Sequence, residues 1–453
     1  MRELRIVAIN GCLGYGYEVE SLDAGIAQRP HLVGGDAGST DPGPFYLGTG
    51  RSLVKDGQVE RDLSLALLRA RTAGVPLVIG SAGMAGGDPN LEAVRRILVR
   101  IAREAGLHFR LAVIRAEIDR ARVRDALRAG AITPMPDAPP LAEEAVMDSA
   151  RIVGQMGTEP LAHALARGAD VVLAGRACDT AIYAALPIAE GYDPGLALHM
   201  AKIMECGAQC ALPLAPNDSL LGIIRDGHFL IRPLSARRTC SPASVAAHTL
   251  YEQAEPLLLH EPEGRVDLRD ATFEQVDRQT VRVGGSRFIP APRLRIKLEG
   301  ARRVGFRAFV LAGIRDRAVI ANLPLIEAQV RAAVRRNLGG AGADDAPALG
   351  FRYYGRDAVL GELEPERDRV PHEVGVLIEV VARTQELADH ALSLARSSFL
   401  HCPFPGRRTT AGNLAFPFSP SDVSAGEVHE FSVYHLMDVE DQLALFPIEM
   451  EQV

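Results

Sequence analysis

The feature that most constrains the fold is a regular alternation, in the first half of the chain, between short apolar runs and amphipathic segments. Runs such as LRIVAIN (4–10), HLVGGD (31–36) and VPLVIGSAG (75–83) have the length of strands. Each is followed by a helical segment, and two more such pairs begin at 109 and 169. This order indicates an α/β fold, with a doubly wound, mostly parallel sheet over residues 1–230.

The pattern changes in the second half of the chain, where strand-like runs follow one another closely. The expected strands are at 275–283, 292–299, 303–313, 373–383 and 430–439, and the expected helices are at 248–259, 323–338 and 384–399. Closely spaced strands favour hairpins over crossovers. We therefore expect residues 231–453 to form a second, α+β domain, with β-hairpins and a split β-α-β layer of the ferredoxin-like type.

Composition narrows the choice of partners. The 453 residues carry a formal net charge of -7, with Lys and Arg dispersed, so no basic surface for nucleic acid is expected. No apolar run approaches the roughly 20 residues of a membrane helix, and the six cysteines are widely spaced, as reduced thiols are. We expect a cytoplasmic protein that binds neither nucleic acid nor a membrane. Apolar strands in the second half favour a homodimer or another homo-oligomer.

The loop after the second expected strand, GGDAGSTDPG, carries the least usual chemistry. In an open parallel sheet the loops after the strands converge on one crevice, where helix N-termini favour anions. Asp36 and Asp41 would repel an anion there. Three roles stay open: a general base, a hard divalent-metal site that includes Ser39 and Thr40, or a capped turn.

Two further loops are expected at the same crevice. GSAGMAGG (80–87) is uncharged and opens a helix, so its amides and Ser81 suit a carboxylate or phosphate, with close packing as the alternative. AGRACDT (174–180) places Arg176 and Cys178 at a strand-to-helix junction. Arg176 suits bidentate binding of a carboxylate, and Cys178 is either a reactive group or an inert buried thiol.

These loops supply the candidate site residues. The catalytic candidates are Asp36, Asp41, Cys178 and Asp179. The candidates for substrate binding are Gly14, Gly38, Ser39, Thr40, Ser81, Gly83, Gly86, Arg176, Thr180, Lys202 and Arg407, the last in a long Pro-rich loop that is either a binding loop or a packed connector. The segment HMAKIMECGAQC (199–210) has a spacing of His and Cys that is unusual for zinc, which favours core cysteines.

The loops also resemble those of a known family. GCLGYG, GGDAGSTDPGPFYLGTG, IGSAGMAGGDPN and VVLAGRACDTAIYAALP are similar to the acyclic terpene utilisation family, AtuA type, in a short branch. The resemblance covers residues 3–235 and, more weakly, the ending EFSVYHLMDVEDQLALFPIE. It implies a role in bacterial catabolism of acyclic terpenoids and related carboxylic acids, and a ferredoxin-like module at the C-terminus, as in some members. It assigns no role to individual residues.

Three hypotheses on function follow. In the first, a catabolic enzyme acts on a small carboxylic acid or its acyl-CoA ester by proton abstraction with addition or elimination. Asp36 or Asp41 is the base, and Arg176 with the amides of the third loop holds a carboxylate or stabilises an enolate. In the second, a divalent metal between the two aspartates serves a hydrolase or lyase. In the third, the chain is a non-catalytic subunit that binds an acyl ligand. A divalent metal and CoA are therefore the only cofactors under consideration.

Overall fold

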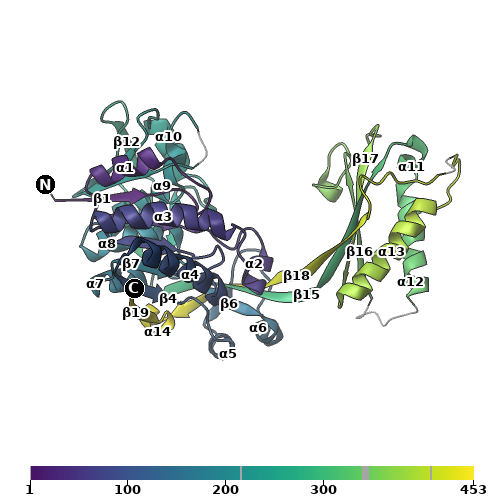
Figure 1. Ribbon diagram of the computed structural model, residues 1–453, viewed down its shortest axis with the longest axis horizontal. Coiled ribbons are helices and arrows are strands. Elements are labelled where there is room, and N and C mark those ends of the chain that lie inside the picture. The colour runs from purple at the N-terminus through teal and green to yellow at the C-terminus, as the bar shows by residue number, and fades with distance from the viewer. Residues whose placement is uncertain (1, 215–216, 339–345, 409–410) are drawn as a thin grey trace. The chain divides into compact units, whose positions relative to one another are not determined.

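The chain folds into two compact units. The computed structural model describes residues 2–214, 217–338, 346–408 and 411–453 (Figure 1). Unit 1 comprises residues 1–302 and 431–453, and unit 2 comprises residues 303–430. The division expected near residue 230 falls inside strand β9 (His228–Pro233) of unit 1, because β9 pairs with β8 (Leu220–Arg225), and β8 pairs with the first strand of the chain.

A large mixed sheet organises unit 1, which confirms the α/β class. Its strands in the described residues follow the order β12-β13-β9-β8-β1-β2-β3-β7-β4-β19. The central strands β1 (Glu3–Ala8), β2 (Leu32–Asp36), β3 (Leu77–Gly80), β7 (Val171–Ala174) and β4 (Arg110–Ile114) are parallel. They coincide with the five strands expected from the sequence.

Antiparallel strands extend this parallel centre on both sides. On the β1 side these are β8 (Leu220–Arg225), β9 (His228–Pro233), β13 (Val281–Gly284) and β12 (Thr272–Gln275). On the other side β19 (Ile448–Gln452) pairs with β4. The expectation of a mostly parallel sheet therefore holds for the centre alone, since residues from the end of the chain return to the sheet.

Helices cover both faces of the sheet. Alternate side chains of β1 enter different cores: Ile6 packs with α7 (Thr158–Ala166), α8 (Asp179–Ala189) and α9 (Pro194–Met204), and Val7 packs on the opposite side. The helices on the Val7 side are α1 (Val19–Ala27), α3 (Asp56–Thr72) and α4 (Asp88–Ala105). The alternation follows from the two-residue period of a strand. No helix in the described part of the chain combines the length and apolarity that a membrane crossing requires.

Helix α4 illustrates how local sequence sets the boundaries of an element. It begins at Asp88, has Pro89 in its first turn and ends at Gly106, whose φ of 63° is left-handed. Proline suits the first turn because its missing N–H has no helical partner there, and glycine reaches the left-handed conformation at low cost. The sequence DPNLEAVRRILVRIAREAG (88–106) predicts this helix with Asp88 as its N-cap; the structure confirms the helix and its end at Gly106, and places the N-cap at Gly87.

Unit 1 also contains several short helices and strands. They are α2 (Pro44–Thr49), α5 (Arg120–Arg128), β5 (Ile132–Pro134), α6 (Glu143–Asp148), β6 (Arg151–Gly154), α10 (Pro242–Thr249), β10 (Leu258–Glu261), β11 (Gly264–Asp267), β14 (Arg287–Pro290) and α14 (Gln442–Leu445). The helix predicted at 248–259 is wrong. Helix α10 ends at Thr249, Pro256 disfavours its continuation, and Leu258 starts a strand that pairs with β11.

Unit 2 has a sheet of order β16-β17-β15-β18. Its elements are the end of β15 (Leu294–Ile314), α11 (Arg317–Ala321), α12 (Leu323–Asn337), β16 (Ala348–Tyr354), β17 (Val374–Ala382), α13 (Gln385–His401) and the start of β18 (Asp422–Val439). Figure 1 shows α12 and α13 side by side, and both contribute to one apolar core with the buried face of β17. The predicted helices at 323–338 and 384–399 are confirmed, whereas the strands expected at 292–299 and 303–313 form the single strand β15.

A glycine contact between two loops of the parallel sheet allows a stability test. Gly86 has a φ of 66°, and a Cβ there would lie 2.2 Å from the backbone nitrogen of Arg176. Gly86→Ala should lower the free energy of unfolding by about 3 kcal/mol, because left-handed strain adds to a clash with backbone. Gly106→Ala is the control, because Gly106 has a similar φ of 63° but no atom lies within 4 Å of a Cβ built there. This substitution should lower the free energy of unfolding by about 1 kcal/mol. Equal losses in urea unfolding would contradict the close contact.

Candidate functional site

Unit 1 brings together a group of ionisable and thiol side chains where the parallel strands end. We call this group the acid–base cluster, and it consists of Asp36, Arg176, Cys178, Asp179, Thr180, Lys202, Glu205, Glu261, Lys297 and Glu299. Asp36 is the last residue of β2, and Arg176 to Thr180 join β7 to α8. Parallel strands present their carboxyl ends at one edge, which is why these loops meet.

Arg176 and Glu299 form a buried ion pair at the base of the cluster. The Nε of Arg176 donates to Glu299 at 2.8 Å, and both side chains are almost fully buried. Glu299 also accepts from Thr40 at 2.9 Å and pairs with Lys297 at 2.8 Å. Burial alone would raise the pKa of Glu299, but Arg176 and Lys297 outweigh it and lower this pKa to about 2. Glu299 is therefore a carboxylate at every physiological pH.

The third loop packs on Arg176. The Ser81 hydroxyl accepts from Arg176 at 3.2 Å and from the amide of Ala177 at 3.3 Å. The Gly83 carbonyl accepts from the side chain of Asn90, and the Gly86 carbonyl accepts from the Arg176 amide at 3.1 Å. The geometry of Ser81, Gly83 and Gly86 therefore corresponds to close packing between two loops, and the arginine proposed to bind a carboxylate already has one.

The first glycine loop closes on a carboxylate of the protein itself. The amides of Gly14 and Gly16 donate to one oxygen of Asp62 at 2.7 and 2.9 Å, and Asn10 donates to the same oxygen at 3.3 Å. Asp62 lies in α3 and is fully buried. The loop thus has the geometry of an anion-binding turn, but its anion comes from α3.

The two aspartates of the second loop lie in different environments. Asp36 is 6% exposed, and its Oδ1 has no hydrogen-bond partner among the described residues. Burial raises the pKa of Asp36 well above its ordinary value, and the charge of Asp179 adds to this. Asp41 is exposed and accepts from the Ser39 hydroxyl at 2.7 Å. Asp36 is therefore protonated at low cost, while Asp41 forms a local turn contact.

Asp179 faces the same region from the first turn of α8. Burial raises its pKa although Arg176 and Lys202 oppose that shift. Its side chain is 33% exposed and lies 3.5 Å from Arg176. The charge of Asp179 in turn disfavours ionisation of Asp36.

Cys178, Thr180 and Glu261 form a hydrogen-bonded triplet beside the aspartates. The Glu261 carboxylate accepts from the Cys178 thiol at 3.1 Å and from the Thr180 hydroxyl at 2.7 Å. Burial raises the pKa of Glu261 to about 8, against the effect of these two hydrogen bonds. Burial also raises the pKa of Cys178 far above its usual range. The thiol is therefore protonated, and Glu261 can gain or lose a proton near neutral pH.

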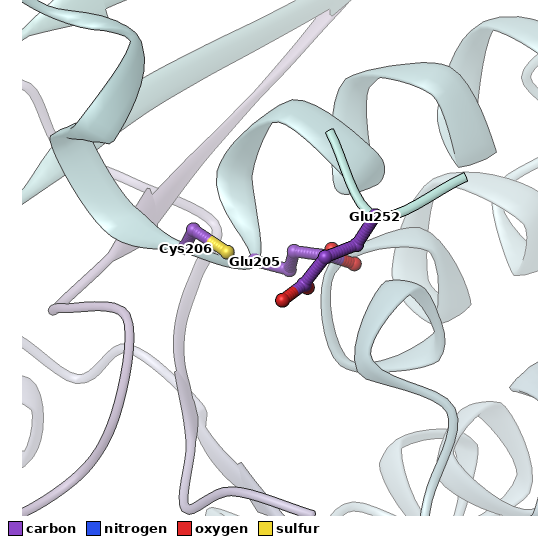
Figure 2. Close-up of side chains that lie close together, drawn as sticks. All are labelled: Glu205, Cys206 and Glu252. Atoms are coloured by element: carbon purple, nitrogen blue, oxygen red, sulfur yellow. The ribbon is translucent and has the colours of Figure 1, made fainter. Parts of the chain in front are cut away.

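Lys202 pairs with Glu205 through a short contact on α9 and its C-cap. Burial raises the pKa of Glu205 to about 8, and Lys202 opposes this shift. Figure 2 shows Glu205, Cys206 and Glu252 pointing toward one another, and their ligand atoms lie within 4.8 Å of each other. A metal ion at this place would compete with the Lys202 ammonium, which already neutralises Glu205.

His199 of α9 and the cysteines Cys210 and Cys240 belong to the core. His199 is fully buried between the hydroxyls of Ser286 and Thr249, at 2.6 and 3.0 Å. Burial lowers its pKa to about 3, so the ring is neutral. Cys210 packs against Cys240, with 3.8 Å between the sulfur atoms.

Arg407 lies in unit 2. Its Nε donates to Asn413 at 3.1 Å, and the Asn413 side chain donates to the carbonyls of Phe399 and Cys402. The described part of the Pro-rich loop is therefore fastened to the end of α13, as a packed connector is.

A cavity of about 480 Å³ opens beside the triplet. Its lining includes Cys178, Glu261 and Lys297, and apolar walls are formed by Met135, Ile289, Pro290, Pro292 and Leu436. His260 and the charged residues Arg265, Arg293 and Arg295 also line the cavity. Its volume suits a small organic ligand.

Sequence reasoning missed Glu205, Glu261, Lys297 and Glu299. Each is separated from the glycine-rich loops by many residues, and strand pairing or helix packing brings it to the cluster. A signal existed for two of them: in the run RLRIKLE (293–299) charged residues alternate with apolar ones, so Lys297 and Glu299 lie on one face and need partners if that face is buried.

The ion pair of Glu299 can be tested by substitution. Glu299→Gln should lower the free energy of unfolding by about 3 to 5 kcal/mol, because it leaves Arg176 and Lys297 buried without their carboxylate. The control Glu449→Gln removes an exposed partner of Arg115 and should change stability by less than about 1 kcal/mol. Both are measured by urea unfolding, and similar losses would show that the buried pair is dispensable.

The raised pKa of Glu261 predicts how stability depends on pH. The carboxyl holds its proton to about pH 8 in the folded chain and only to its ordinary value of 4.5 when unfolded. Stability should therefore fall as pH rises from 4.5 to 8, by up to about 1.4 kcal/mol per pH unit for one such group. Glu261→Gln mimics the protonated form and should flatten the decline of the melting temperature. An unchanged slope would mean that Glu261 is ionised throughout.

Comparison with known proteins identifies the family. A family model described as acyclic terpene utilisation family protein AtuA matches residues 58–414. No curated protein matches the chain, and no solved structure does. The matched region contains the loops after β3 and β7, Glu261 and Glu299. This chain belongs to the acyclic terpene utilisation family AtuA.

Proposed function

We propose that the protein is a catabolic enzyme that acts on a small carboxylic acid or its acyl-CoA ester by proton abstraction with addition or elimination. Family membership points to acyclic terpene utilisation. The observation that carries the proposed chemistry is the position of Glu261, a carboxyl group with a pKa of about 8, on the wall of an apolar cavity. A base with such a pKa abstracts a carbon-bound proton better than an ordinary carboxylate.

Each residue of the triplet has a role in the proposed reaction. Glu261 takes a proton from the carbon next to the substrate carbonyl, and the electron pair of the broken C–H bond moves onto the carbonyl oxygen. The Thr180 hydroxyl holds one carboxylate oxygen of Glu261, and the Cys178 thiol donates to the same oxygen. Loss of a leaving group from the neighbouring carbon, or addition of water in the reverse direction, completes a lyase or hydratase reaction.

Lys297 is the group proposed to stabilise the enolate. It lines the cavity, and burial would lower its pKa, but Glu299 outweighs that effect and keeps the ammonium charged. A fixed positive charge in a partly dry cavity stabilises a developing oxyanion more than it stabilises the neutral carbonyl. Arg176 is the residue that the sequence suggested for stabilising the enolate. It instead acts on Lys297 indirectly, through their shared partner Glu299.

Asp36 and Asp41 remain the alternative bases. Asp36 has the raised pKa and the unpaired oxygen that a base needs, whereas Asp41 is engaged by Ser39 at the surface. Replacing each by Asn separates the alternatives. If a divalent metal is the essential group, a chelator abolishes activity. If the chain is a non-catalytic acyl-binding subunit, no turnover is seen at all.

The test is solvent-deuterium exchange. In deuterium oxide, the wild-type protein should exchange the protons on the carbon next to the carbonyl of isovaleryl-CoA or of isovalerate. The exchange is measured as the mass increase of the compound by mass spectrometry. Glu261→Gln should slow the exchange by about a hundredfold or more, the usual loss on removing a general base. Glu274→Gln changes an exposed acid that pairs with Arg282 outside the cavity; it is the matched control and should not change the rate.

Other outcomes identify the competing hypotheses. Exchange that survives Glu261→Gln but is lost in Asp36→Asn or Asp41→Asn moves the base to the second loop. Exchange that disappears with EDTA and returns with a divalent cation indicates the metal mechanism. No exchange with either compound contradicts acid–base chemistry on this class of substrate.

A further inference from the structure

We infer that the cavity binds an acyl thioester of a phosphate-bearing carrier of the CoA type, with the acyl carbonyl at the floor and the phosphates at the mouth. The inference rests on the proposed function, which identifies the acyl group as the part of the ligand that reacts. It narrows the proposed substrate from a free carboxylic acid or its acyl-CoA ester to the acyl-CoA ester alone. It follows from how exposure and charge are distributed over the lining.

The lining divides by exposure into a floor and a mouth. At the floor are Cys178 and Glu261, which bond to each other, and Lys297, whose side chain is 18% exposed. At the mouth the side chains of His260, Arg293 and Arg295 are 58, 74 and 47% exposed, and Arg265 is exposed as well. The reacting groups therefore lie deep, and the arginines lie where the cavity meets solvent.

The floor is crowded with carboxyl groups of the protein itself. Lys297 and Arg176 share the carboxylate of Glu299, and Arg176 also lies 3.5 Å from Asp179. A carboxylate that entered the floor would meet Glu261 and raise its pKa further, since like charges disfavour each other. An uncharged thioester carbonyl avoids this cost and still meets the Lys297 ammonium.

The mouth has the opposite balance, with more guanidinium than carboxylate. Arg293 and Arg295 share one partner, Asp438, at 3.1 Å each. Arg265 has no ion-pair partner in the described part of the chain. Three guanidinium groups thus face one carboxylate, and guanidinium is the side chain best matched to phosphate oxygens.

The two ends of the lining lie apart along the chain. Arg295 is two residues before Lys297 in β15, and a strand rises by about 3.3 Å per residue, so their Cα atoms lie about 7 Å apart. Arg293 precedes the first residue of β15 and is the more exposed of the two arginines. In a free acid the carboxylate is bonded directly to the carbon that loses its proton. In a CoA thioester the phosphates are separated from that carbon by a long uncharged arm, and Ile289, Pro290, Pro292 and Leu436 supply apolar walls for such an arm.

The experiment measures binding by titration calorimetry with three probes: isovaleryl-CoA, CoA and isovalerate. The thioester and CoA should bind, and isovalerate should bind at least tenfold more weakly. Arg265→Ala should weaken binding of CoA by about tenfold, the loss of one charge-assisted contact. Arg278→Ala removes an exposed arginine outside the cavity and is the matched control, with melting temperatures confirming that both variants fold.

The outcomes separate this inference from the proposed chemistry. Binding of isovalerate as tight as that of its thioester, or CoA binding that Arg265→Ala and Arg293→Ala leave unchanged, would overturn the inference. Glu261→Gln should keep its affinity for CoA. Arginine-dependent binding of the thioester without deuterium exchange would support the inference and reject the acid–base function, and exchange on isovalerate alone would do the reverse.

Discussion

The carboxylate of Glu299 is the interaction on which the site depends. One side chain of β15 receives hydrogen bonds or ion pairs from Arg176, Thr40 and Lys297, and so joins the loops after β2 and β7 to the strand that lines the cavity. Taking these charges out of water is costly, and the arrangement is stable because both cations have a carboxylate within hydrogen-bond distance. Arg176 therefore acts indirectly, through Glu299, and Lys297 is the cation of this group that lines the cavity.

Much of unit 1 could be predicted from sequence because its parallel strands are short apolar runs bounded by glycine and its helices have clear ends. The antiparallel strands could not, because they extend the sheet with residues from distant parts of the chain. The segment after Thr249 shows the reason most directly. Its leucines fit a helical period, but pairing of β10 with β11 decides its conformation and places Glu261 at the cavity.

Sequence could predict which of the loop residues lie close together, but only part of what surrounds them. Asp36, Cys178, Asp179 and Thr180 follow strands of the parallel sheet, and the structure brings all four to one place. The glycines were read as ligand contacts because backbone amides in such loops commonly bind anions. In this chain Asp62 takes the amides of Gly14 and Gly16, a partner 46 residues or more away that no local pattern reveals.

Strand β15 contributes residues to both units. In unit 1, Arg295, Lys297 and Glu299 share one face of this strand, and in unit 2, Ala308, Val310 and Ala312 enter the apolar core. Because side chains alternate with a period of two, inserting or deleting one residue inside either stretch would turn the residues beyond it to the opposite face. Within each stretch, changes in length are therefore tolerated in steps of two, or with a bulge that absorbs the extra residue.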